Sequence, residues 1–174
     1  MRRKKREHLD DYELNEKGEY VYRGQMWRWE SPEARTRTIR AEWLFSGAGL
    51  AFLIAAGFVP ASGVGSTFFV LIPYVLAVVV DLVAMTSLWK LTREGEQVRE
   101  YLKDTVSDAL AGEFTAMVIL CCAASIGQLV CMVTSMGLLV DKGLGLAFLL
   151  CLLASGACAF CAVRTSQQLR FVKE

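Results

Sequence analysis

Histidine is almost absent from this sequence, because His8 is the single histidine among 174 residues. Catalytic triads and the HExxH zinc motif both require histidine at a folded site, and His8 stands in a highly charged N-terminal stretch. The Gly-x-Gly pairs that begin at Gly47 and Gly143 lack the third glycine of a dinucleotide-binding loop. The single histidine and the incomplete glycine motifs therefore argue against an enzyme, and they indicate no cofactor and no metal site of these types.

Charge is missing from four long stretches, although the chain carries 19 Lys and Arg and 18 Asp and Glu. Asp81 is the only formally charged residue within residues 43–59, 68–89, 114–140 and 144–163. A hydrocarbon layer about 30 Å thick is crossed by about 20 helical residues, so each stretch can span it. The sequence predicts an all-α membrane protein, a bundle of four transmembrane helices.

The basic residues are distributed unevenly around these stretches. Residues 1–40 hold eleven Lys and Arg, 90–113 hold four, the segment after 163 holds three, and 60–67 hold none. The positive-inside rule then predicts a multi-pass protein of the cell membrane with both termini in the cytoplasm. Trp43 and Trp89 should lie at the cytoplasmic interface, which favours indole rings. A charged region of about forty residues precedes the first stretch, which is too long for a signal peptide, so we expect a membrane span there.

Three regions follow from this organisation: a cytoplasmic arm (1–40), the transmembrane bundle (41–164) and a cytoplasmic tail (165–174). Within the bundle, residues 90–113 carry Leu and Val mostly at intervals of four among charged residues, which predicts a solvated helical hairpin. In the arm, Ser31 and Pro32 resemble a helix start, so we expect an interfacial helix that continues into the first span.

The arm also has a basic run and an aromatic run. The basic run suits a topology determinant or an anchor on anionic membrane lipid, and nothing there forms a folded nucleic-acid-binding face. The aromatic run predicts a small β-hairpin, which would serve as a structural lid or dock a partner protein. The two runs comprise Arg2, Arg3, Lys4, Lys5 and Arg6, and Tyr20, Tyr22, Trp27 and Trp29.

Asp81 is the most informative single residue. It lies eight residues from Trp89, about 12 Å deep at 1.5 Å per residue, so it should face the bundle interior and find a partner or take up a proton. Measured from the outer ends of the spans, Gln128 lies at a similar depth, which predicts a polar centre made by Asp81 and Gln128. Pro73 shares a helix stripe with Asp81 and removes a backbone donor, so we expect a helix kink there.

Cysteine is absent outside the predicted spans, and all six cysteines lie in the third and fourth. Cys121, Cys122, Cys158 and Cys161 would be the ligands or redox pairs of a thiol site facing the cytoplasm, although buried thiols more often pack as small hydrophobic groups. Small residues also recur every four positions in three spans, which suits close helix packing within the bundle or in a homo-oligomer.

These features lead to three hypotheses. The first is a non-enzymatic membrane component, either a small transporter subunit or an accessory scaffold, centred on Asp81 and Gln128. The second is a thiol redox or metal-sensing membrane protein. The third is a membrane-anchored regulator that docks a partner through the aromatic arm. Membrane lipids, a second copy of the chain or another membrane protein are the expected partners.

Overall fold

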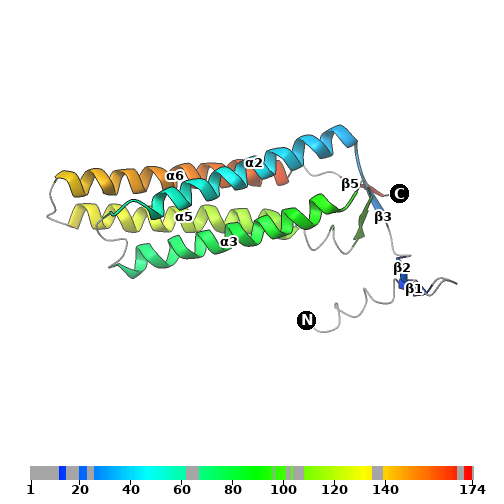
Figure 1. The fold of residues 1–174 in the computed structure, drawn as a ribbon, viewed down its shortest axis with the longest axis horizontal. Helices are drawn as coiled ribbons and strands as arrows, with labels where there is room; N and C mark the ends of the chain where they lie inside the picture. Colours follow the sequence, from blue (N-terminus) through cyan, green and yellow to red (C-terminus); the bar gives the residue numbers. More distant parts are fainter. Residues whose placement is uncertain are drawn as a thin grey trace.

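Four long helices, packed side by side, form the body of the protein (Figure 1). They are α2 (Pro32–Gly57), α3 (Phe68–Arg93), α5 (Asp108–Thr134) and α6 (Leu139–Ser166). This computed structural model describes residues 12–14, 20–22, 26–61, 67–95, 97–100, 103, 108–134, 139–167 and 171–173. Within these ranges all four helices are long and apolar enough to cross a membrane. The number, length and composition of the helices thus confirm the predicted four-helix bundle.

The first helix begins where the sequence predicts. Ser31 adopts an extended backbone and its Oγ accepts a hydrogen bond of 3.0 Å from the Ala34 amide, while Pro32 occupies the first turn, where no amide donor is needed. The helix then continues to Gly57 without a break, so the expected interfacial helix and the first span are one element.

The helices pack around the centre in the order α2, α3, α5 and α6, with antiparallel neighbours. In α2 the buried side chains recur alternately every three and four residues, at Ile39, Glu42, Ser46, Gly49, Leu53 and Ala56. This spacing is the a and d pattern of a seven-residue repeat, which keeps one stripe of a helix against its neighbours along its whole length. Each stripe is called the seam of its helix below.

A three-stranded sheet lies at one end of the bundle, which we call the sheet end. Its central strand β3 (Met26–Trp29) pairs in antiparallel fashion with β4 (Gln97–Arg99) and with β5 (Phe171–Lys173). The sheet thus joins the segments before α2, after α3 and after α6 (Figure 1). The opposite end, where α2 connects to α3 and α5 to α6, is called the loop end.

β4 overturns one prediction, because residues 97–99 form a strand where the sequence indicated a charged helical hairpin over 90–113. α3 ends at Arg93, where the Arg35 guanidinium donates to the carbonyl oxygens of Thr92 at 3.2 Å and Glu94 at 2.7 Å. Val98 is fully buried in a cluster with Trp29, Ile39 and Leu91. Pairing with β3 and the burial of Val98 outweigh the local preference for a helix. The spacing of Leu and Val along the sequence contains no information about these distant partners.

The arm contains the predicted hairpin. β1 (Tyr12–Leu14) pairs with β2 (Tyr20–Tyr22) in antiparallel fashion, and residues 15–19 between them lie outside the described ranges. The basic run Arg2–Arg3–Lys4–Lys5–Arg6 also lies outside the described residues, as do the side chains of Tyr20 and Tyr22.

Candidate intramembrane polar site

Asp81 lies at the centre of the bundle, completely excluded from solvent. Its Oδ1 accepts a hydrogen bond of 2.9 Å from the Ser46 hydroxyl of α2. Its Oδ2 has no hydrogen-bond partner in the described part of the chain. A carboxyl group in this setting keeps one oxygen free to carry a proton or to accept a further donor.

All four helices contribute to the surroundings of Asp81. A methyl group added at Gly49 of α2 would lie 3.8 Å from Asp81 Oδ2, 3.7 Å from Ser155 Oγ of α6 and 3.2 Å from Met117 Cε of α5. Ser46 and Gly49 are three residues apart on the α2 seam, so both face inward. We call Ser46, Gly49, Asp81, Met117 and Ser155 the Asp81 centre. An added methyl group would already contact all three of these side chains, so the Asp81 centre is tightly packed and suits a proton better than an organic ligand.

Gln128 is not the partner of Asp81, so this part of the predicted polar centre is wrong. Gln128 is fully buried, but both of its amide atoms lack hydrogen-bond partners among the described residues. Its Nε2 lies close to Gly145 of α6. Met117, which shares the level of Asp81, precedes Gln128 by eleven residues, or about 16 Å along α5. Depth counted from the outer end of each predicted span placed Gln128 about three helical turns from its true level relative to Asp81.

Two further carboxyl groups, one buried and one partly buried, lie one turn from the Asp81 centre toward the sheet end. Glu42 precedes Ser46 by one turn on the α2 seam, is 1% exposed, and has no hydrogen-bond partner for either oxygen among the described residues. Glu113 precedes Met117 by one turn in α5, and its Oε1 accepts a hydrogen bond of 3.1 Å from Ser87 of α3. Its Oε2 has no partner in the same described ranges.

Sequence reasoning missed Glu42 and Glu113 because the predicted spans began one residue after each of them. A charge at the end of an apolar stretch is normally assigned to the membrane interface. For Glu42 a usable signal existed, since it stands four residues before Ser46 and seven before Gly49, in the inward-facing repeat. Glu113 offers no comparable signal, because it lies beside the seam residue Phe114 and is only partly buried.

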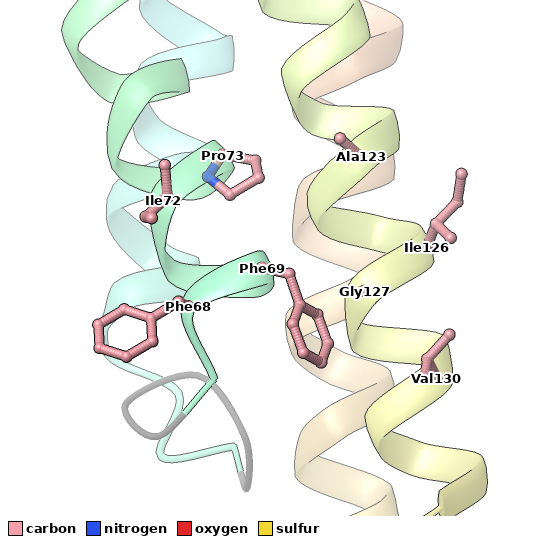
Figure 2. Close-up of a pocket in the computed structure, with 8 residues that line it drawn as sticks. All are labelled: Phe68, Phe69, Ile72, Pro73, Ala123, Ile126, Gly127 and Val130. Carbon is pink, nitrogen blue, oxygen red and sulfur yellow. The ribbon is translucent and has the colours of Figure 1, made fainter.

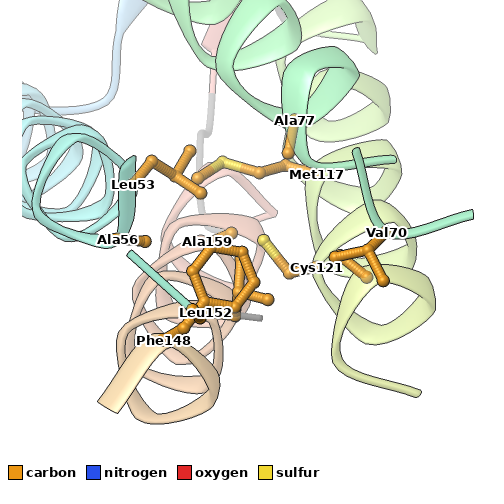
Figure 3. Close-up of a cluster of buried hydrophobic side chains, with 11 residues drawn as sticks. Leu53, Ala56, Val70, Ala77, Met117, Cys121, Phe148, Leu152 and Ala159 are labelled. Carbon is orange, nitrogen blue, oxygen red and sulfur yellow. The ribbon is translucent and has the colours of Figure 1, made fainter. Parts of the chain in front are cut away.

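An apolar cluster occupies the other half of the interior, from Asp81 to the loop end. Leu53, Val70, Phe148 and Leu152 are each fully buried there, and Figure 3 shows them with their neighbours between the four helices. The Tyr74 hydroxyl donates to the Leu53 carbonyl at 3.0 Å within this region. A second fully buried apolar cluster, which contains Leu88, Leu110 and Phe114, lies on the sheet-end side of Asp81. The two halves of the described interior therefore differ in their carboxyl groups, which lie on the sheet-end side, and not in the presence of hydrocarbon.

The predicted interface and arm residues pack on one another at the sheet end. Trp43 donates from Nε1 to Thr92 Oγ1 at 3.0 Å and meets Trp89 edge to face at 6.4 Å between ring centroids. Trp29 is 5% exposed and lies 4.7 Å from the Phe171 ring, while the Lys103 ammonium lies 3.3 Å from the ring centroid of Trp27. Trp29 is thus covered by the protein itself.

The thiols are dispersed. Cys121 is buried with its sulfur 4.0 Å from Ser155 Oγ, whereas Cys122 and Cys161 are exposed and Cys158 is partly buried. All six cysteines are free. Within the described ranges no group of three or more His, Cys, Asp or Glu side chains could hold a metal ion.

An apolar groove of about 840 Å³ runs along the contact between α3 and α5 near the loop end. Figure 2 shows Phe69 and Pro73 of α3 across from Gly127 of α5. A methyl group added at Gly127 would lie only 3.0 Å from the Phe69 carbonyl oxygen, so the two backbones approach closely here. α3 continues as one helix through Pro73, and the predicted kink stays a prediction.

The four apolar helices define a multi-pass membrane protein whose interior carries buried carboxyl groups. Comparison of the chain with protein-family models, curated proteins and solved structures finds no match. The functional argument therefore rests on the site itself.

Proposed function

We propose that the protein is a non-enzymatic membrane component, a small transporter subunit, in which Asp81 binds and releases a proton. The observation that carries this proposal is the environment of Asp81: complete burial, one hydrogen bond from Ser46 and one oxygen without a partner. Intramembrane carboxyl groups are rare because they are costly to bury, and those that persist commonly mark ion or proton pathways.

The main rival is an accessory scaffold in which Asp81 only locks helix packing. A structural carboxyl group is best satisfied by donors to both oxygens, since each buried acceptor without a donor costs about 1–3 kcal/mol. Asp81 has a donor on one oxygen, and Glu42 has none on either among the described residues. A bundle selected only for packing gains little from these groups, whereas a proton site needs a carboxyl group that can change its protonation state.

Orientation forms part of the same proposal. The segments that meet at the sheet end hold most of the chain's Lys and Arg, which by the positive-inside rule places this end and both termini in the cytoplasm. Anionic lipids would then contact the basic residues around it. A second copy of the chain or another membrane protein would pack on the apolar outer faces of the helices.

The other two hypotheses have weaker support. The described residues supply no three-ligand metal group, and Cys121 is buried beside Ser155 and deep in the bundle. Partner docking through the arm would need accessible aromatic rings, and Trp29 is covered by Phe171 and its neighbours. Neither feature favours these functions over the Asp81 centre.

Infrared difference spectroscopy of the protein in liposomes tests the proposal, because a protonated carboxylic acid has its own C=O stretching band. We expect a band that changes with pH in the wild-type protein and is missing from Asp81→Asn. Asparagine keeps an oxygen to accept the Ser46 hydrogen bond, so the bundle should remain folded, which thermal unfolding would check. Glu30→Gln, a substitution of an exposed carboxyl group, is the matched control and should retain the band. A band assigned to Asp81 that is constant across the pH range would refute proton binding and favour the scaffold.

A further inference from the structure

Glu42 and Glu113 occupy one level of the bundle, although they come from different helices. Ser46 of α2 donates to Asp81, and Met117 of α5 lies against Gly49 beside Asp81. Glu42 precedes Ser46 by one turn, and Glu113 precedes Met117 by one turn. Both carboxyl groups therefore lie about 6 Å from the Asp81 level, on the sheet-end side. Together with Ser87, which donates to Glu113, they form what we call the acidic layer.

The members of the acidic layer differ in exposure. Glu113 is partly exposed as a residue, although its Oε2 is buried, and the nearby Lys90 is exposed. Glu42 is 1% exposed and has two oxygens without partners in the described residues. Exposure thus falls from Glu113 to Glu42 and Asp81. Toward the loop end, the described interior holds the Tyr74 hydroxyl but no buried carboxyl group.

We propose that Asp81 exchanges protons only with the sheet end, and that Glu113 and then Glu42 relay each proton. In each transfer one carboxylic O–H bond breaks and one forms on the next carboxylate, so no other reactant is needed. Neither oxygen of Glu42 has a hydrogen-bond partner among the described residues, so no hydrogen bond joins it to Glu113 or to Asp81. A bridging water molecule or a rotamer change must therefore complete each transfer. This inference rests on the proposed function of Asp81 and adds a route and a direction to it.

Other titratable groups face the relay. The thiols of Cys121 in α5 and Cys158 in α6 lie within electrostatic range of Asp81, and Lys90 of α3 lies within range of Glu113. The thiols are poor relay members, since thiols are weak donors and weak acceptors in hydrogen bonds. Lys90 is exposed and marks the outer side of the acidic layer, where proton exchange with the medium would begin.

The test measures how fast the Asp81 infrared band responds to a rapid pH change in reconstituted full-length protein. Glu42→Gln and Glu113→Gln keep the side-chain shape but cannot relay a proton as a carboxyl group. We expect each to slow the response by about a hundredfold, the lower end of what a positioned proton-transfer group contributes. Glu42→Asp, which keeps the carboxyl group, should restore most of the rate. Thermal unfolding of each variant checks that the bundle is intact.

Gln128→Met is the matched control, because it replaces a buried polar side chain on the loop-end side of Asp81. It should leave the rate unchanged, and slowing equal to that of Glu42→Gln would overturn the one-sided route. If the Asp81 band follows pH but both glutamine variants respond at the wild-type rate, the relay is wrong and the proposed function stands. If the band does not respond to pH even in the wild-type protein, the proposed function and the relay both fail.

Discussion

Gly127 offers the sharpest test of how the bundle is packed. The carbonyl oxygen of Phe69 would normally accept a hydrogen bond from the amide of residue 73, but Pro73 has no amide hydrogen. Gly127 lies directly against this oxygen, so that an added Cβ would be 3.0 Å from it and 3.1 Å from Val70 Cγ2. The glycine therefore allows α5 to approach α3, and its Cα–H groups can contact the free carbonyl.

The perturbation is Gly127→Ala, compared with Gly47→Ala. An alanine at Gly47 meets nothing within 4 Å, so it should gain up to about 1 kcal/mol from the higher helix propensity of alanine. Gly127→Ala has the same gain but must push apart two helix backbones, and overpacking of this kind typically costs about 1–3 kcal/mol. Because the propensity gain cancels in the comparison, Gly127→Ala should be less stable than Gly47→Ala by about 1–3 kcal/mol.

Unfolding of both variants in mixed micelles with a denaturing detergent, followed by tryptophan fluorescence, gives this difference directly. Proteins with equal unfolding midpoints, or a more stable Gly127→Ala protein, would show that the α3–α5 contact is not as close as the structure has it. In that case the free Phe69 carbonyl would need another explanation.

Three further predictions concern single contacts. Ser46→Ala removes the only donor to Asp81 among the described residues and should lower the free energy of unfolding by about 1–3 kcal/mol. The same substitution in an Asp81→Asn background should lower it less. A double-mutant cycle, measured by unfolding in detergent, gives both values. Trp43→Phe keeps a ring but loses the hydrogen bond to Thr92, so thermal unfolding should show a loss of about 0.5–1.5 kcal/mol. Val98→Asp puts a charge into the cluster beneath the sheet and should speed proteolysis around β3 and β4, while an unchanged cleavage pattern would contradict the described sheet.

Much of the fold could be predicted from the sequence because it depends on local hydropathy. A backbone in hydrocarbon must satisfy its own hydrogen bonds, so four apolar stretches of sufficient length can only be helices, wherever their neighbours lie. The start of α2 is equally local, since Ser31 and Pro32 cap and begin a helix through contacts within one turn. The β1–β2 hairpin also follows from neighbouring residues.

The sheet and the site depended on contacts between distant parts of the chain. β4 forms because Val98 is buried beside Trp29, about seventy residues earlier, and no local window contains that partner. The identity of Asp81 as an inward-facing acid was visible in the sequence, but its partner was not. The ends of the spans are uncertain in the sequence, and each residue changes the estimated depth by about 1.5 Å. The estimated depths therefore paired Asp81 with Gln128 and assigned Glu42 and Glu113 to the membrane interface. Only the packed bundle, which fixes the relative levels of four helices, brings Ser46 to Asp81 and places an acidic layer one turn away.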